Sequence, residues 1–246
     1  LVAELIDAKT GDLVWADLFE SDPVSFLDAE EQIAKTIVSR LGAAPHGDVA
    51  SGPSTDRDAA QREYVLARHY LSRRTPQVFP EALEHFTEAV ELDPRYALAH
   101  VGVAEAYLLG AEQRQLAPAE ALAAAEAAAR RAFDLDPGLA QAHAALGAVA
   151  AARWDFDRAE TSYRRALEID AGIARVHEQY AALLTVGDRH EAAIAEARIA
   201  RDLDPTCPAA ATALAAAYYH AGQGDAAIDQ ALAALRLTPR FAAAYD

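Results

Sequence analysis

The sequence predicts a mainly α-helical fold, a superhelical solenoid of antiparallel helix pairs, preceded by a small β-β-α segment. The first observation is a repeat of helix-ending residues with a period of 34. These residues are Pro94, Pro137, Ala171, Pro205 and Pro239, and each of the last three steps spans 34 residues. The first step spans 43 residues, which indicates an insertion of nine near Gly110–Pro118. A fixed period of this length is typical of stacked repeats.

The second observation is a set of small residues that keep the same register. The second helix of each repeat carries two columns, seven residues apart: Ala82, Ala125, Ala159, Ala193 and Ala227, then Ala89, Ala132, Ala166, Ala200 and Ala234. The first helix carries a third column: Ala104, Gly147, Ala181 and Ala215. Two helices approach closely only where side chains are small, so the columns predict the contact seam of each pair.

The ends of the helices have a physical cause as well. Proline disfavours helical geometry in the residue before it, so each Leu-Asp-Pro sequence ends one helix and starts the connection to the next. Ala171 replaces proline in one copy. We expect a softer boundary there, held in place by the register of its neighbours.

The quoted columns resemble the small–small–aromatic–proline pattern of tetratricopeptide (TPR) repeats. The resemblance covers about residues 60–241 and implies five repeats, at residues 60–96, 97–139, 140–173, 174–207 and 208–241, with residues 242–246 starting a further one. Two copies depart from the pattern. The first has an extended segment between its helices, Ser72 to Pro80, and the second carries the insertion of nine residues.

Residues 1–42 show no such repeat. Two short apolar runs, Leu1–Ile6 and Leu13–Phe19, flank Lys9-Thr10-Gly11-Asp12, which predicts a β-hairpin. Apolar residues then recur at helical spacing from Phe26 to Leu41, and residues 43–59 are rich in Pro, Gly, Ser and Asp, which predicts a linker. The chain starts with Leu1 and contains no methionine, so we expect it to be a piece of a longer protein.

The stretch Ala3–Ala16 resembles the end of a TolB-like α/β domain, and Tyr64–Thr75 followed by Ala82–Pro94 looks like the entry to the repeats in the same proteins. The resemblance implies a bacterial regulatory protein. The upstream partner in that group is often the winged-helix DNA-binding domain of a transcriptional activator, and sometimes a class III nucleotide cyclase. In the second case this chain is the regulatory arm of an enzyme whose catalytic domain lies elsewhere.

Composition excludes several classes of partner. A formal net charge of −16 and a pI near 4.8 argue against direct contact with nucleic acid or anionic lipid. Residues 205–224 contain no Asp, Glu, Lys or Arg, but alanine dominates them and they fit the repeat register, so we expect no membrane span. We expect a cytoplasmic protein, with a periplasmic arm of a membrane-anchored regulator as the alternative. The single cysteine, Cys207, indicates neither a disulfide nor a metal cluster.

The sequence contains no motif of catalysis, phosphate binding or metal binding, so we expect no enzyme activity, cofactor or metal in this chain. One histidine column allows two interpretations: His100, His143 and His177 share one position in successive repeats. A metal or proton ladder is one interpretation. Packing is favoured, because equivalent atoms of stacked helices lie roughly 10 Å apart, too far for shared ligands.

The predicted site is the concave groove formed by the first helices, which we expect to bind a protein or peptide partner or a second protomer. Its predicted residues are Val65, His69, Leu98, Val101, Glu105, Leu108, Gln141, Ala144, Ala148, Arg175, Glu178, Gln179, Ala182, Thr212, Ala216 and Tyr219. TPR domains that clamp a chaperone's carboxylate use lysines where this chain has Val101, Ala144, Glu178 and Thr212, so such a clamp is not expected. A second candidate site is the extended segments, with Arg73, Arg74, Arg114 and Gln115.

Overall fold

The computed structural model describes residues 2–6, 13–18, 54–72 and 79–237 of the 246-residue chain. The chain forms two compact units, residues 1–52 and residues 53–246, which are described separately below. Within the first unit, strand β1 (Val2–Ile6) pairs antiparallel with β2 (Leu13–Leu18), and Val2 lies opposite Leu18. The predicted hairpin is therefore confirmed, with a register shift between Leu5 and Ile6. Its predicted turn and the predicted helix from Phe26 to Leu41 lie outside the described residues.

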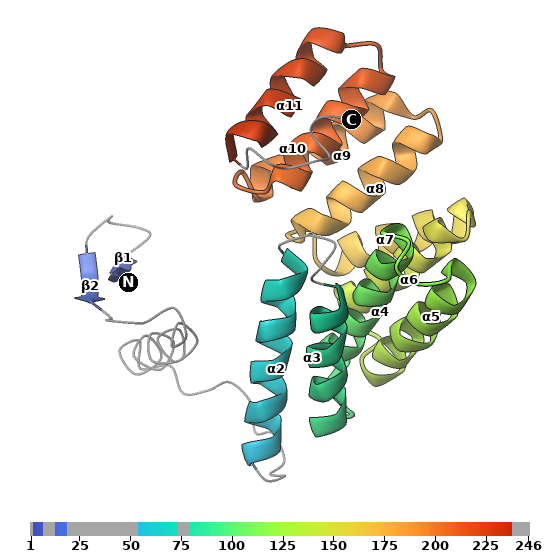
Figure 1. The fold of residues 1–246 in the computed structure, drawn as a ribbon. Helices are drawn as coiled ribbons and strands as arrows, with labels where there is room; N and C mark the ends of the chain where they lie inside the picture. Colours follow the sequence, from blue (N-terminus) through green and yellow to red (C-terminus); the bar gives the residue numbers. More distant parts are fainter. Residues whose placement is uncertain (1, 7–12, 19–53, 73–78, 238–246) are drawn as a thin grey trace. The chain divides into compact units, whose positions relative to one another are not determined.

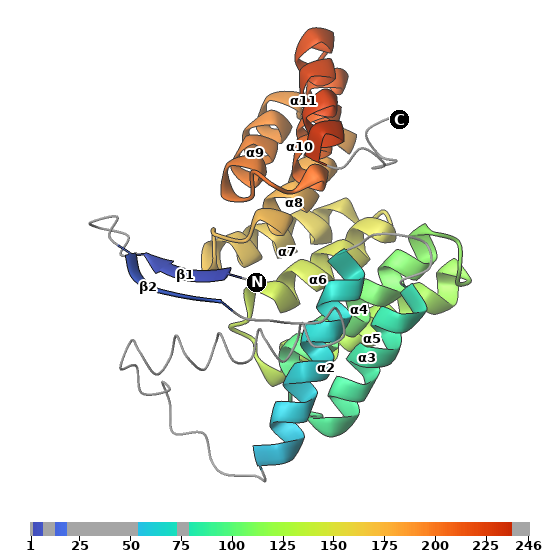
Figure 2. The same ribbon diagram turned by 60° about the vertical axis from the view of Figure 1, so that its left-hand side comes forward.

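The described part of the second unit consists of ten α-helices, which pack as five antiparallel pairs (Figures 1 and 2). The pairs are α2 (Ser54–Ser72) with α3 (Phe79–Leu92), α4 (Ala97–Glu112) with α5 (Pro118–Leu135), α6 (Ala140–Ala152) with α7 (Phe156–Ile169), α8 (Ala174–Val186) with α9 (His190–Leu203), and α10 (Pro208–His220) with α11 (Gly224–Leu237). Each pair packs on the next through its second helix, and neighbouring first helices also touch. The mainly α solenoid predicted from the period is confirmed.

The small-residue columns form the seam of each pair. All the alanines of the two second-helix columns are buried, and so are Ala104, Gly147 and Ala181 of the first-helix column. Aromatic rings from the second helices fill the space that the glycines leave: Phe86 packs on Gly102, and Tyr163 on Gly147. The core is thus a series of alanine seams with a few large side chains between them.

An aspartate turns the chain at each described repeat junction. The residue after the second helix is Asp93, Asp136, Asp170 or Asp204. Its Oδ1 atom accepts a hydrogen bond from the backbone N–H two residues later, at 2.8 to 3.2 Å. This turn holds the Asp170–Gly172 junction as well, where Ala171 replaces proline, so proline is not required for the boundary.

The nine-residue insertion lengthens two helices and the connection between them. Compared with the third pair, it adds three residues to the end of α4, two to the connection and four to the start of α5. Pro118 then occupies the first turn of α5, where proline is favoured. The second pair therefore extends one helical turn beyond the third, and this extra turn forms one wall of the site described below.

The predicted linker is too long at its C-terminal end. The sequence predicts a linker over residues 43–59, whereas α2 already begins at Ser54. The cause lies in the residue types: Pro, Ser, Thr and Asp form loops, but they are also favoured at helix N-termini, where Asp56 meets the positive end of the helix dipole. Residues 205–224 comprise the junction before α10, α10 itself and the turn that leads to the first residue of α11, as the repeat register predicts. No helix in the described residues has the length and apolar character needed to cross a membrane.

Candidate functional site

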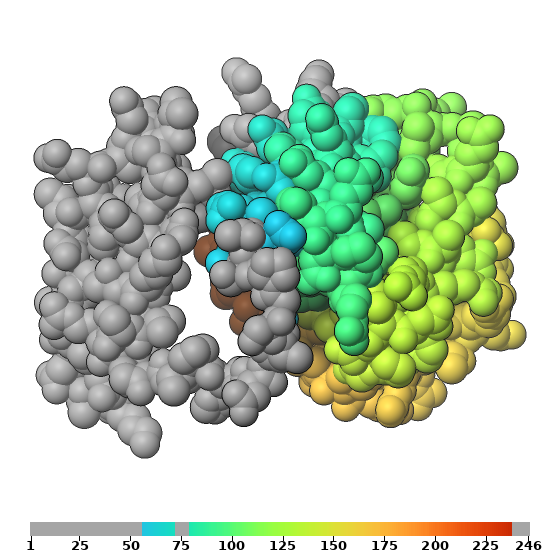
Figure 3. Space-filling model, turned by 90° about the horizontal axis from the view of Figure 1, so that it is seen from below, coloured from blue at the N-terminus to red at the C-terminus, as the bar shows by residue number. Residues whose placement is uncertain are grey.

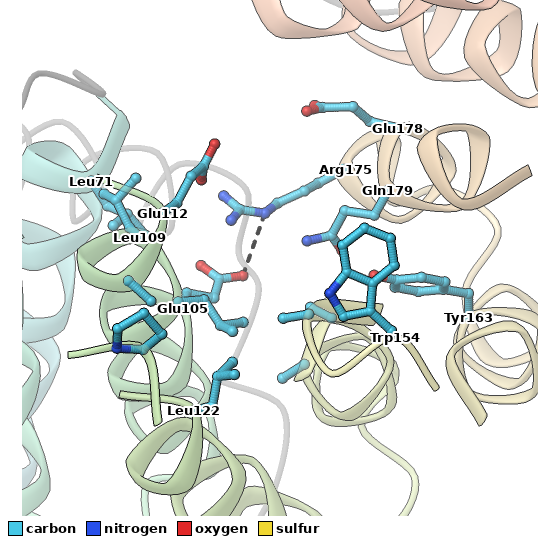
Figure 4. A pocket seen from close by; sticks show the side chains of 16 residues that line it. Leu71, Glu105, Leu109, Glu112, Leu122, Trp154, Tyr163, Arg175, Glu178 and Gln179 are labelled. Carbon is cyan, nitrogen blue, oxygen red and sulfur yellow. Dashed lines mark ion pairs between the residues drawn. The ribbon is translucent and has the colours of Figure 1, made fainter. Parts of the chain in front are cut away.

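The first helices of three successive pairs border a groove of about 710 Å³ (Figure 4). Its lining residues come mainly from α4, α6 and α8, and from the lengthened end of the second pair: Leu71, Glu105, Leu108, Leu109, Ala111, Glu112, Pro118, Leu122, Ala145, Ala148, Ala152, Trp154, Tyr163, Arg175, Glu178 and Gln179. Leucines and Trp154 supply apolar contacts, and three carboxylates and one guanidinium supply charge. This composition suits a polypeptide segment with both apolar and polar side chains.

Helical spacing places these side chains on one face. On α4, Leu108 and Leu109 lie three and four residues after Glu105, and Glu112 lies three residues after Leu109. On α8, Glu178 and Gln179 lie three and four residues after Arg175. On α6, between them, the chain has only alanine at the facing positions, Ala145, Ala148 and Ala152. Because alanine has no side chain beyond Cβ, the middle helix forms a low floor between two higher walls.

An ion pair bridges these walls. The Nε atom of Arg175 lies 3.5 Å from Oε1 of Glu105, and the other carboxylate oxygen accepts a hydrogen bond from Arg68 Nη1 at 2.7 Å. Glu105 is the main cause that raises the pKa of Arg175, and Glu178 raises it further, so the guanidinium stays charged. The side chain of Glu105 is only 14% exposed. One carboxylate therefore pairs with two arginines, one from α2 and one from α8, and offsets one of their two charges.

Trp154 is the most unusual residue of the groove. It follows α6 directly after Arg153, its φ is +62°, and it is 78% exposed. Its ring contacts that of Phe156 at a centroid distance of 5.7 Å, and Figure 4 shows the indole among the side chains that line the groove. The same left-handed position recurs 34 residues later at Asp188 and again at Gly222, residues that tolerate this conformation well. A large exposed aromatic side chain is unexpected at this position.

Tyr163 lies at the base of the same edge. It is almost fully buried against Gly147, and burial raises the pKa of its hydroxyl group. Its ring packs near that of Tyr180 on α8, with 6.3 Å between the centroids. Tyr163 therefore supports α6 and α8 rather than offering an ionisable group.

The groove includes part of the predicted site. Glu105, Leu108, Ala148, Arg175, Glu178 and Gln179 line it together. Val101 and Ala144, predicted to face the groove, are buried instead, with 4% and 8% exposure, because these positions pack between neighbouring pairs. The remaining predicted residues lie on the first helices but do not line this cavity: Val65, His69, Leu98, Gln141, Ala182, Thr212, Ala216 and Tyr219.

Sequence reasoning missed the residues supplied by helix ends and by second helices. Leu71, Glu112 and Trp154 lie at or just beyond the C-terminal ends of first helices, and Leu122 and Tyr163 lie on second helices. The nine-residue insertion was the signal available for Glu112 and Leu122, because it lengthens α4 and α5. For Trp154, the available signal was a large aromatic residue at a position where the next two repeats have Asp188 and Gly222.

The histidine column has a structural role. The Nε2 atoms of His100, His143 and His177 lie 3.0 to 3.1 Å from the carbonyl oxygens of Pro94, Pro137 and Ala171. A carbonyl oxygen only accepts, so each ring donates from Nε2. The rings tie the start of each first helix to the junction before it. The sequence favours a packing role for these histidines. The structure adds a hydrogen bond to that role.

The second predicted site is a shallow hollow. Arg114 and Gln115 line it with Ala111, Glu112 and Leu116–Pro118, and its volume is about 560 Å³. Arg73 and Arg74 lie outside the described residues. Among the described residues, one group of potential metal ligands is also present, Glu63, His85 and Glu88, away from the groove.

Comparisons with known proteins agree on the fold. A thermophilic TPR protein from Thermus thermophilus matches with a TM-score of 0.63 at 19% identity, over 76% of this chain and 95% of that one. PilF of Pseudomonas aeruginosa matches with a TM-score of 0.54 at 18% identity, over 78% and 82% of the two chains. No family model and no curated protein matches the sequence. Identities this low establish architecture alone: the chain has the fold of tetratricopeptide repeat proteins.

Proposed function

We propose that this chain is a non-enzymatic interaction module that holds a segment of a partner protein in the groove between α4, α6 and α8. The observation that carries the proposal is Trp154, exposed at the groove edge in a left-handed backbone conformation. This conformation costs a residue with a large side chain roughly 1 kcal/mol or more, and an exposed indole recovers little of that by burial. Binding explains the residue better than stability does.

The chemistry of the groove is consistent with a polypeptide ligand. Trp and Arg are among the residues that most often dominate protein interfaces, and the groove offers Trp154 and Arg175. Leu108, Leu109 and Leu122 offer apolar surface in the same groove as Trp154, and Gln179 can pair with backbone groups of a bound segment. The alanine floor of α6 leaves space for an apolar helix or an extended chain. Stacked repeats commonly present such surfaces to partners.

We place this module in a bacterial signalling or transcriptional regulator. The support is the resemblance of residues 3–16 to the end of a TolB-like domain, which makes residues 1–42 the tail of that domain and the helix pairs its C-terminal neighbour. The alternative is the regulatory arm of a nucleotide cyclase. The upstream sequence distinguishes the two, because a cyclase domain carries metal-binding aspartates and a winged helix carries a basic recognition helix. A cytoplasmic location is part of the same proposal.

Affinity capture with matched variants tests the binding function. The bait is the whole chain, and the groove variants are Trp154→Ala and Ala148→Trp, the second of which fills the floor at a position that is not buried. Asp188→Gly is the control, because it alters the equivalent turn one repeat later, outside the groove. We expect one discrete partner from bacterial lysate, retained by the control and lost with both groove variants.

Retention of the same partner by both groove variants would contradict the proposal. Light scattering of the bait alone examines self-association. A dimer that Trp154→Ala dissociates would make the second protomer the partner, with the groove still the binding site. A dimer unaffected by both variants, with no partner captured, would remove the groove from the function.

A further inference from the structure

Three potential metal ligands meet between the first two helices of the solenoid. Nδ1 of His85 on α3 lies 2.7 Å from Oε2 of Glu63 on α2. One carboxylate oxygen of Glu88, also on α3, completes a group whose three donor atoms all lie within 4.8 Å of one another. The group lies outside the groove described above, and neither the repeat pattern nor the proposed binding function accounts for it.

Rigid elements hold these side chains together. His85 and Glu88 are three residues apart, so they share one face of α3, and the antiparallel packing of α2 brings Glu63 to that face. Tyr70, two turns after Glu63 on α2, stacks on the His85 ring with 5.4 Å between the centroids and 8° between the planes. The stacking holds the ring in the orientation in which Nδ1 faces Glu63. Figure 3 shows parts of α2 and α3 at the surface, and the side chains of His85 and Glu63 keep 25% and 21% exposure, so an ion in solution can reach them.

The local charge favours a cation. Helix α3 carries four glutamates, Glu81, Glu84, Glu88 and Glu91, and no lysine or arginine. Within the described part of the chain, no arginine forms an ion pair with Glu63 or Glu88. Glu63 is only 21% exposed. Two carboxylates therefore face one imidazole, which offsets at most one of their charges, whereas a divalent ion offsets both.

We propose that Glu63, His85 and Glu88 bind a divalent transition-metal ion, for which Zn²⁺ is the best match. Imidazole nitrogen and carboxylate oxygen bind zinc at about 2.0–2.2 Å, which places tetrahedral ligands roughly 3.3 Å apart. The His85–Glu63 separation of 2.7 Å is shorter than that value, and all three donor atoms lie within 4.8 Å of one another, so rotamer changes can close the site. Three protein ligands leave a fourth position for water. The ion would cross-link α2 to α3, whose connection is the extended segment of the first repeat.

Titration calorimetry of the whole chain with zinc chloride, after removal of metal by EDTA and dialysis, tests the site. We expect one tight equivalent and a rise in Tm when Zn²⁺ is added, because the ion binds the folded helix pair. His85→Gln and Glu88→Gln should each weaken that equivalent at least tenfold. His220→Gln removes an exposed histidine from α10 and controls for binding to isolated histidines; it should leave the tight equivalent unchanged.

Glu88→Gln separates a metal site from a plain ion pair. In EDTA its Tm should equal that of the unaltered chain, because the Glu63–His85 pair does not involve Glu88. In zinc it should lose most of the added stability. The proposal is overturned if the unaltered chain shows no tight equivalent, or if Glu88→Gln and His85→Gln bind zinc as tightly as the unaltered chain does.

Discussion

The Nε2 atom of His177 lies 3.0 Å from the carbonyl oxygen of Ala171, six residues earlier in the chain. The same bond recurs at His100 and His143, so it is a property of the repeat rather than of one junction. His177 differs from His143 in two respects. Its Nδ1 atom also lies 2.6 Å from Oε2 of Glu196, and its side chain is buried.

Replacing His177 should therefore be more costly than replacing His143. His177→Phe keeps a ring of similar shape but removes both the carbonyl bond and the carboxylate bond, so we expect a loss of roughly 2–4 kcal/mol in the free energy of unfolding. His143→Phe removes only the carbonyl bond at a half-buried position, and we expect about 1 kcal/mol. Urea denaturation measures both values. Equal losses would show that the second bond of His177 contributes nothing.

Trp154 should strengthen partner binding but contribute little to the stability of the fold, or even lower it. Trp154→Gly relieves the left-handed backbone of a large residue while removing little buried surface. We expect the free energy of unfolding to stay within about 1 kcal/mol of its original value or to rise, while partner affinity falls at least tenfold. Asp188→Gly makes the same backbone change one repeat later and should leave affinity unchanged. A large loss of stability with Trp154→Gly would make the indole a structural residue.

The close approach of α3 and α4 depends on Gly102. A Cβ atom added there would overlap the ring of Phe86, which is fully buried and has nowhere to move. We expect Gly102→Ala to destabilise the chain by roughly 1–3 kcal/mol, although alanine is the better helix former. Gly224→Ala is the control, because no atom lies within 4 Å of the added Cβ. It should be neutral or slightly stabilising in thermal unfolding, and a stabilising Gly102→Ala would contradict the packing.

Glu160 should make the third and fourth pairs sensitive to acid. It accepts hydrogen bonds from Arg189 at 2.9 and 2.7 Å and from the Tyr180 hydroxyl at 3.0 Å, and the Arg189 bonds are the main cause that lowers its pKa. A pKa that is lower in the folded state gives stability that is present above the unfolded value, 4.5, and lost as the pH falls through the folded value. Glu160→Gln should therefore destabilise most near neutral pH.

The measurement is the urea midpoint of the unaltered chain and of Glu160→Gln, at pH 7 and again at about pH 3. The difference between the two proteins should be larger at pH 7 and shrink in acid. Glu168→Gln breaks an exposed pair with Arg165 and should have little effect at either pH. A difference that grows in acid would reverse the assigned direction of the Glu160 shift.

The repeat period was sufficient to predict the fold because one structural unit recurs. Alanine columns such as Ala89 and Ala132 could be assigned to the seam without coordinates, since every copy repeats the same packing requirement. The Asp170 turn was harder to predict. The sequence contains the aspartate, but the recurring proline predicts a boundary made by proline, whereas the carboxylate makes the turn and holds it at Ala171 as well.

The site was predicted only where it follows the repeat. Arg175 and Glu178 occupy standard groove positions, so the register located them. Trp154 and Leu122 were not predicted, because they depend on where helices end and on how far the second pair extends. Val101 was predicted to face the groove but is buried, for a related reason. One repeat position faces either the groove or the neighbouring pair, depending on the local rotation of its helix. The spacing of residues in the sequence does not contain that rotation.

Site-specific photo-cross-linking tests the central claim, a partner segment held in the groove, most directly. A photoreactive amino acid is placed at Leu122 in the groove wall and, in a second chain, at the exposed residue Ile199 on α9, and each chain is irradiated with the captured partner. We predict a cross-link from position 122 that Trp154→Ala abolishes, and none from position 199. Cross-linking from position 199 with none from position 122 would contradict the account, because the partner would then bind outside the groove.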